Sequence, residues 1–159
     1  MTRIRAYIDL MKLRVVELLI ITTVPAVVLA EGGFPSLALL AWTLIGGTLA
    51  AGSANAFNMV IESERDKLMK RTAKRPLVTG VVSRTEATLF ACAIGLLSLA
   101  IFYIFTTPLA TLLTAIAILY YVVIYTIALK PNTSQNIVWG GAAGCMPVLI
   151  GWAAVTNSL

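Results

Sequence analysis

Long runs of residues without any charge constrain this chain more than any other feature. Residues 87–129 form an uncharged run of 43 residues, residues 34–61 form one of 28, and no residue after Lys130 is charged. A helix needs about 20 apolar residues to cross the hydrocarbon of a bilayer, so the longest run predicts two crossings. Only 12% of all residues are charged, against about 25% in a soluble domain. The sequence therefore predicts an integral membrane protein.

Turn signals divide the apolar sequence into five predicted helical spans. Gly-Gly and Pro residues, or clusters of polar residues, interrupt the apolar pattern between them. The predicted spans cover residues 15–30, 36–61, 86–106, 109–129 and 137–155. The expected fold class is all-α, a polytopic transmembrane helical bundle.

The positive charges predict the orientation of this bundle. Residues 1–14, 62–85 and 130–136 contain four, seven and one Lys or Arg, which account for all twelve. The connections on the opposite side contain none. Because Lys and Arg concentrate in cytoplasmic loops, we expect a cytoplasmic N-terminus. We also expect a multi-pass protein of the plasma membrane whose active site faces the cytoplasm.

The polar end of the second predicted span carries a candidate metal site. Asn58, Glu62 and Asp66 are four residues apart, so on a helix they share one face. Two carboxylates at this spacing repel unless a cation lies between them. Mg²⁺ typically takes one or two protein carboxylates and completes its shell with water and phosphate oxygens. The chain has no His, which excludes a His-ligated zinc site and an imidazole base.

Basic residues follow directly and could bind an anion. They are Lys67, Lys70, Arg71, Lys74 and Arg75, enough positive charge to hold a phosphate group. Two plainer interpretations remain open at this point. The basic cluster could bind anionic lipid headgroups. Glu62 and Asp66 could pair with Arg65 and Lys70 on a solvated helix end, where such pairs contribute little.

A longer pattern around these residues resembles a known family. The motif NxxxExxxDxxMxRTxxRP, from Asn58 to Pro76, is similar to the first aspartate-rich motif of the intramembrane (UbiA-type) prenyltransferases. Residues 12–19, 46–58, 75–80 and above all 133–156 (TSQNIVWGGAAGCMPVLIGWAAVT) resemble the protohaem IX farnesyltransferase branch, the haem O synthases. The likeness covers nearly the whole chain.

The resemblance implies a reaction and a set of site residues. The reaction is transfer of a farnesyl group from farnesyl diphosphate to a vinyl group of protohaem IX, within the lipid bilayer. The cofactor would be Mg²⁺, held by Asn58, Glu62 and Asp66 as the catalytic group. The diphosphate-binding candidates are Lys70, Arg71, Arg75, Tyr125 and Lys130. We expect no nucleic-acid partner.

Two departures from the family pattern qualify this expectation. Glu62 stands where the family usually has Asp, which keeps the charge but moves it by about one methylene group. The family's second acidic motif is missing from residues 1–159. We therefore expect a single prenyltransferase domain that is incomplete at its C-terminus and inactive alone. The alternatives are a prenyltransferase with a quinone-precursor acceptor and a non-catalytic protein that binds lipid or assists oxidase assembly.

Overall fold

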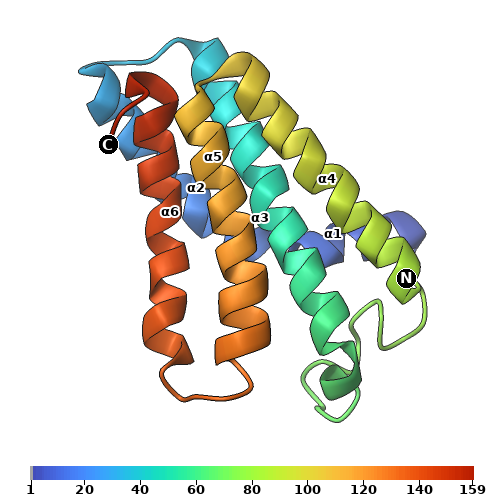
Figure 1. Ribbon diagram of the computed structural model, residues 1–159. Coiled ribbons are helices and arrows are strands. Elements are labelled where there is room, and N and C mark those ends of the chain that lie inside the picture. Colours follow the sequence, from blue (N-terminus) through green and yellow to red (C-terminus); the bar gives the residue numbers. More distant parts are fainter. Residues whose placement is uncertain (1) are drawn as a thin grey trace.

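Residues 2–159, which the computed structural model describes, form helices joined by turns, with no strand among them. Figure 1 shows the bundle. The helices are α1 (Arg3–Met11), α2 (Leu13–Glu31), α3 (Leu37–Asp66), α4 (Arg84–Phe105), α5 (Pro108–Leu119), the π-helix η1 (Tyr120–Leu129) and α6 (Asn136–Thr156). The prediction of an all-α bundle is confirmed.

The five predicted spans are also confirmed. The helices α2, α3, α4 and α6, together with the continuous pair α5–η1, are each long and apolar enough to cross a membrane. The helix α3 continues past the predicted end of its span at residue 61 to Asp66, as the shared helix face of Asn58, Glu62 and Asp66 implied. Residues 3–11, for which the sequence analysis predicted no element, form the helix α1. The charged residues 62–66 therefore extend a span and do not begin a connection.

Local capping explains where the spans begin and end. The Ser83 hydroxyl accepts a hydrogen bond from the backbone of Glu86, whose carboxylate accepts one from the backbone of Ser83, a capping box. Thr107 caps α5 with a single hydrogen bond, which its hydroxyl accepts from the Ala110 backbone, ahead of Pro108 in the first turn. Gly32 closes α2 in a left-handed conformation, with φ of 70°. Of these positions, Gly32 and Pro108 coincide with the Gly-Gly and Pro turn signals of the sequence.

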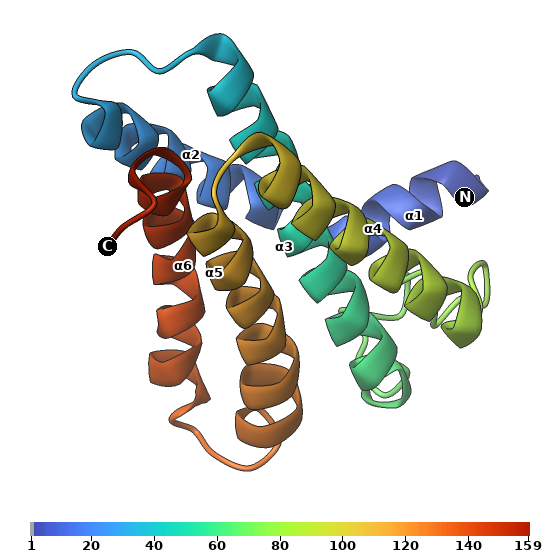
Figure 2. The ribbon, with the colours of Figure 1, turned by 45° about the horizontal axis from the view of Figure 1, so that its top comes forward.

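The helices α3 and α4 lie side by side, joined through small residues (Figures 1 and 2). Ser53 donates a hydrogen bond to the carbonyl of Ala91 at 2.8 Å, and Ser98 donates one to the carbonyl of Gly46 at 2.7 Å. A Cβ added at Gly95 would lie 2.7 Å from the Ser53 oxygen. Small residues and buried hydroxyl groups thus allow the close backbone approach that packs helices in membranes.

Both charged connections lie at one end of the bundle, here named the charged end. Figure 1 shows residues 67–83 and residues 130–135 together at the bottom of the view, with the C-terminus at the opposite end. The short helix α1 lies across the bundle (Figure 2). Its Ala6 and Leu10 pack against α3 and α4 in a buried apolar cluster. The continuous helix α5–η1 packs antiparallel to α6, and α6 packs against α2 to complete the bundle.

Candidate active site

The helix α3 carries its polar residues inward at the charged end. Asn58 and Asp66 are 1% exposed, and Glu62 is 8% exposed. The four-residue spacing puts all three side chains on the face of α3 that packs against other segments. The two carboxylates therefore lie inside the protein, where they could hold a cation.

Cations from two distant segments neutralise these carboxylates. Lys130, directly after η1, places its Nζ 2.5 Å from Glu62 Oε1. Arg75, in the connection after α3, forms an ion pair with Asp66 Oδ2. The plainer pairing with Arg65 and Lys70 is therefore wrong for this structure. Lys70 and Arg71 are both exposed, so two of the predicted diphosphate residues lie on the surface and not beside the carboxylates.

The segment after α3 folds back onto the end of that helix. Thr72 donates a hydrogen bond to the carbonyl of Asp66 at 2.7 Å, and the Arg75 backbone donates one to the carbonyl of Thr72 at 2.9 Å. Pro76 is fully buried. This local fold explains the RTxxRP pattern, because Thr72 caps α3, Arg75 meets Asp66, and Pro76 anchors the segment in the core.

The π-helix η1 aims two more side chains at α3. Hydrogen bonds in this segment reach back five residues. The Lys130 amide donates to the carbonyl of Tyr125 at 2.9 Å, and the Thr126 hydroxyl donates to the carbonyl of Tyr121 at 2.8 Å. This register turns Thr126 toward Asn58 and Lys130 toward Glu62. Tyr125 lies beside Lys130, whose Nζ is 5.8 Å from the centre of its ring. Such π-helical segments often occur at functional sites.

Asn58 joins three segments of the charged end. Its Oδ1 accepts a hydrogen bond from Lys12 Nζ at 3.0 Å, and its Nδ2 donates one to the Thr126 hydroxyl at 3.2 Å. Burial lowers the pKa of Lys12 to about 8, with the nearby charges of Arg75 and Lys130 acting in the same direction. Both polar atoms of Asn58 are thus already engaged, so as a metal ligand it would first release Lys12.

The residues at the charged end fit a hard cation. Asp66 Oδ1 is buried without a hydrogen-bond partner, and it is the one side-chain atom in that condition among residues 2–159. An unpaired buried carboxylate oxygen is costly unless something binds it, and oxygen donors suit Mg²⁺. The part of the chain that the structure describes offers no group of three or more acidic, His or Cys side chains for a metal. The chain thus supplies two carboxylates and an amide.

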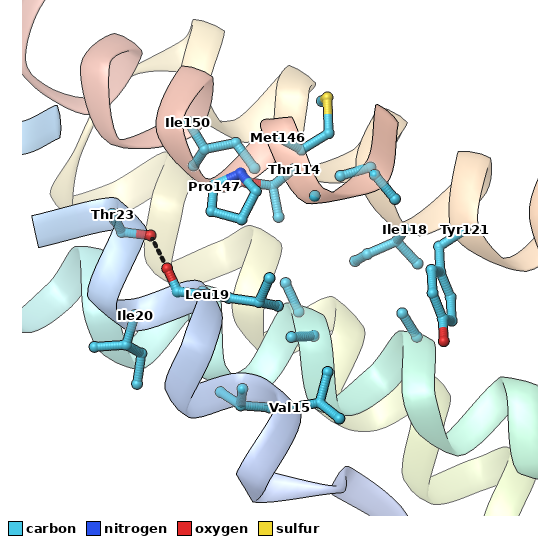
Figure 3. Close-up of a pocket in the computed structure, with 18 of the residues that line it drawn as sticks. Val15, Leu19, Ile20, Thr23, Thr114, Ile118, Tyr121, Met146, Pro147 and Ile150 are labelled. Carbon is cyan, nitrogen blue, oxygen red and sulfur yellow. Dashed lines mark hydrogen bonds between the residues drawn. The ribbon is translucent and has the colours of Figure 1, made fainter. Parts of the chain in front are cut away.

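An apolar cavity runs through the bundle beside this cluster. Its volume is about 260 Å³, and Figure 3 shows side chains of α2, α5, η1 and α6 around it. Small residues of α3 line it as well, namely Gly47, Ala50, Ala51 and Ala54. Asn55 and Tyr121 also line it, and Asn55 is three residues from Asn58 on α3. One end of the apolar cavity is therefore next to the charged cluster.

Comparison with known sequences identifies the family. The sequence model of the UbiA prenyltransferase family matches residues 19–159. The chain belongs to the UbiA prenyltransferase family. With its five apolar helices, this UbiA chain is a multi-pass membrane protein.

Individual relatives carry a more specific name. The chain is 56% identical over 155 residues to the protoheme IX farnesyltransferase of Renibacterium salmoninarum, covering 98% of this chain and 49% of that protein. It is 53% identical over 157 residues to that of Streptomyces coelicolor, covering 99% of this chain and 50% of that protein. The chain thus spans about half the length of the curated relatives it matches.

Solved structures share the fold. A UbiA homologue from Archaeoglobus fulgidus bound to DMAPP and Mg²⁺ superposes with a TM-score of 0.74 at 21% identity, covering 96% of this chain and 55% of that chain. The structure of the homologue with GPP and Mg²⁺ gives a TM-score of 0.73, covering 97% and 55%. These likenesses confirm the helical architecture of the UbiA family.

Sequence reasoning missed three residues that build the charged end. Lys12, Thr72 and Thr126 contact Asn58 or Asp66 in the structure. Lys12 and Thr72 fall inside stretches that resemble the family, but that resemblance gave neither a role. Thr126 lies in an unbroken apolar run. No periodic pattern could have found these contacts, since each one joins separate segments or depends on the π-helical register.

Proposed function

We propose that this chain supplies the diphosphate-binding part of an enzyme that transfers a farnesyl group from farnesyl diphosphate to a vinyl group of protohaem IX, forming haem O. One observation carries the proposal, namely the apolar cavity that ends beside two buried carboxylates and the cations that face them. The names of the half-matched relatives support the choice of substrates. Mg²⁺ and prenyl diphosphates in the structural neighbours support the metal dependence.

Each group at the charged end has a role in this proposal. Asn58, Glu62 and Asp66 would hold Mg²⁺, which would neutralise charge on the departing diphosphate. Arg75 and Lys130 now pair with the carboxylates. With a metal there, both would be free to bind diphosphate oxygens, and fixed cations in a site with little water favour such a leaving group. The surface residues Lys70 and Arg71, and Tyr125 beside Lys130, would attract and orient the diphosphate.

The apolar cavity would hold the isoprenoid tail. It is lined by aliphatic and small side chains, with polar atoms at a few positions only, such as Thr23, Thr43 and Thr114. Such a lining excludes water from the allylic carbon, so the carbon would react with the acceptor and not with solvent. The cavity volume of about 260 Å³ lies near the lower end of ligand pockets.

The test joins this chain to the part of the Streptomyces coelicolor relative that it does not match. The fusion is expressed in a bacterium lacking its own haem O synthase, and the extracted haems are analysed by mass spectrometry. We expect a haem in which one vinyl group has become a hydroxyethylfarnesyl group. Its mass is then raised by one farnesyl group, from farnesyl diphosphate, and one hydroxyl group, from water, while diphosphate leaves. Prenylated aromatic acids without farnesylated haem would favour the quinone-precursor alternative. Neither product, and no Mg²⁺-dependent diphosphate release, would favour a lipid-binding or assembly protein.

Residues 1–159 expressed alone test the domain proposal. We expect this single domain to bind farnesyl diphosphate with Mg²⁺ but not to turn it over, since its described residues hold no third carboxylate at the site. Haem O formed by residues 1–159 alone would contradict this expectation.

Orientation in the plasma membrane can be tested by labelling. The two exposed cysteines, Cys92 and Cys145, are first replaced by Ser. One new cysteine is then introduced, either Lys74→Cys in the charged connection or Gly33→Cys in the turn after α2. In intact cells, a membrane-impermeant maleimide is expected to label the Gly33→Cys chain and not the Lys74→Cys chain. The reverse pattern would place the charged end, and the proposed active site, outside the cytoplasm.

A further inference from the structure

Lys12 occupies a fixed position between two helices. It has a φ of 52°, one of two non-glycine residues with positive φ in the part of the chain described. Such a conformation is uncommon for a side chain of this type and is often found at functional sites. Asn55 holds the junction by donating to the carbonyl of Met11 at 3.0 Å, and Gly52 leaves room for the Met11 side chain. The helix α3 thus holds the Lys12 backbone in place.

Among the described residues 2–159, no carboxylate forms an ion pair with Lys12. The ion pairs of the charged end join Glu62 to Lys130 and Asp66 to Arg75, and the Lys12 ammonium donates to the neutral amide of Asn58. The charged groups that act on Lys12 are the cations Arg75 and Lys130 and these two carboxylates. Three cations thus share two carboxylates, and a divalent metal would add more positive charge. An excess of positive charge in a partly buried cluster favours the binding of an anion.

The position of Lys12 suggests which anion this is. Val15 and Val16, about one turn after Lys12, line the apolar cavity, and so does Asn55, about one turn before Asn58. A tail in the cavity would therefore bring its polar head to Lys12, Arg75 and Lys130 together. We infer that Lys12 is a substrate-binding residue that contacts the diphosphate, so that the α1–α2 junction forms one wall of the diphosphate site. This inference rests on the proposed function.

Equilibrium binding to the purified chain in lipid nanodiscs with Mg²⁺ tests the inference. The probes are farnesyl thiolodiphosphate, which resists cleavage, and farnesol, which lacks the charged head. Lys12→Met is expected to weaken binding of the thiolodiphosphate by about 10- to 100-fold, the usual effect of losing one charge-assisted hydrogen bond. Binding of farnesol is expected to stay unchanged, because the cavity is intact. Lys12→Arg keeps the charge and is expected to stay within about fivefold of the unaltered chain.

Arg5→Met is the matched control, since Arg5 is an exposed basic residue of α1 that takes no part in the charged cluster. We expect it to bind both probes like the unaltered chain. Equal loss of both probes in Lys12→Met would show that Lys12 only holds the helices together, and would overturn the inference. Unchanged thiolodiphosphate binding in Lys12→Met would overturn it as well, and leave the proposed function intact. Failure of the unaltered chain to bind the thiolodiphosphate would overturn both.

Discussion

The two halves of α3 differ in what they contribute, since the first lines the apolar cavity and the second carries buried polar residues. From Thr43 to Ala54 the helix is useful because its side chains are small, and the missing volume becomes the apolar cavity. In the second half, Asn55, Asn58, Glu62 and Asp66 are polar and buried, and each of them contacts another segment. Binding of an amphipathic substrate thus requires space in one region of the helix and fixed charge in the next.

The largest effect is expected when the charge of Asp66 is removed. In Asp66→Asn we expect Mg²⁺-dependent binding of farnesyl thiolodiphosphate to weaken by more than about a hundredfold, since even residues behind metal ligands contribute about 10- to 100-fold. Glu64→Gln is the control, because Glu64 lies on the same helix but is exposed and pairs with Lys67. Equilibrium binding in nanodiscs measures both. Equal affinity in Asp66→Asn and Glu64→Gln would remove the metal role from Asp66.

Filling the apolar cavity tests the other half of the helix. A side chain at Gly47 would meet no atom within 4 Å and would extend into the cavity. We expect Gly47→Leu to weaken farnesyl diphosphate binding by about tenfold or more. The leucine would occupy space that the farnesyl tail needs, and each methylene group of the tail that is no longer buried costs about 0.8 kcal/mol. Binding of inorganic pyrophosphate should not change. Gly141→Leu is the control, because Gly141 has similar space around it but does not line the cavity.

The substitution Gly95→Ala tests whether the packing of α3 against α4 can be weakened without loss of ligand binding. A Cβ at Gly95 would lie 2.7 Å from the Ser53 hydroxyl oxygen, at the contact of α3 with α4. We expect Gly95→Ala to lower the free energy of unfolding by about 1–3 kcal/mol through overpacking, as measured by denaturation in detergent. Gly47→Ala is the control, with no atom in the way. If folded Gly95→Ala, below its melting temperature, no longer bound diphosphate, the binding site would depend on the packing of α3 against α4.

The smallest effect is expected at the end of the bundle opposite the charges. Thr107 caps α5 by accepting from the Ala110 amide, and its hydroxyl donates to the carbonyl of Ala153 at 2.7 Å. We expect Thr107→Val to cost about 1 kcal/mol of unfolding free energy, with no change in ligand affinity. Thr88→Val, which removes only a local hydrogen bond on an exposed face, should change the unfolding free energy by less than about 0.5 kcal/mol. A larger loss at Thr88 than at Thr107 would contradict this view of the α5–α6 contact.

The helical class, the five spans and the shared helix face of Asn58, Glu62 and Asp66 were predictable from the sequence. These follow from local physics, because hydropathy sets the length of a span and the helix period sets which residues share a face. The turns at Gly32 and Pro108 were likewise predictable, since a turn signal acts within a few residues of its own position.

Which cations form ion pairs with the carboxylates could be seen only in the folded structure. By sequence, Arg65 and Lys70 are the near neighbours, yet Arg75 and Lys130 form the ion pairs and Lys12 reaches Asn58. Two of these choices depend on a segment that folds back at Thr72 and on a π-helical register that shifts Lys130. Contacts between segments distant in sequence depend on how whole helices pack, and no local pattern of residues records that packing.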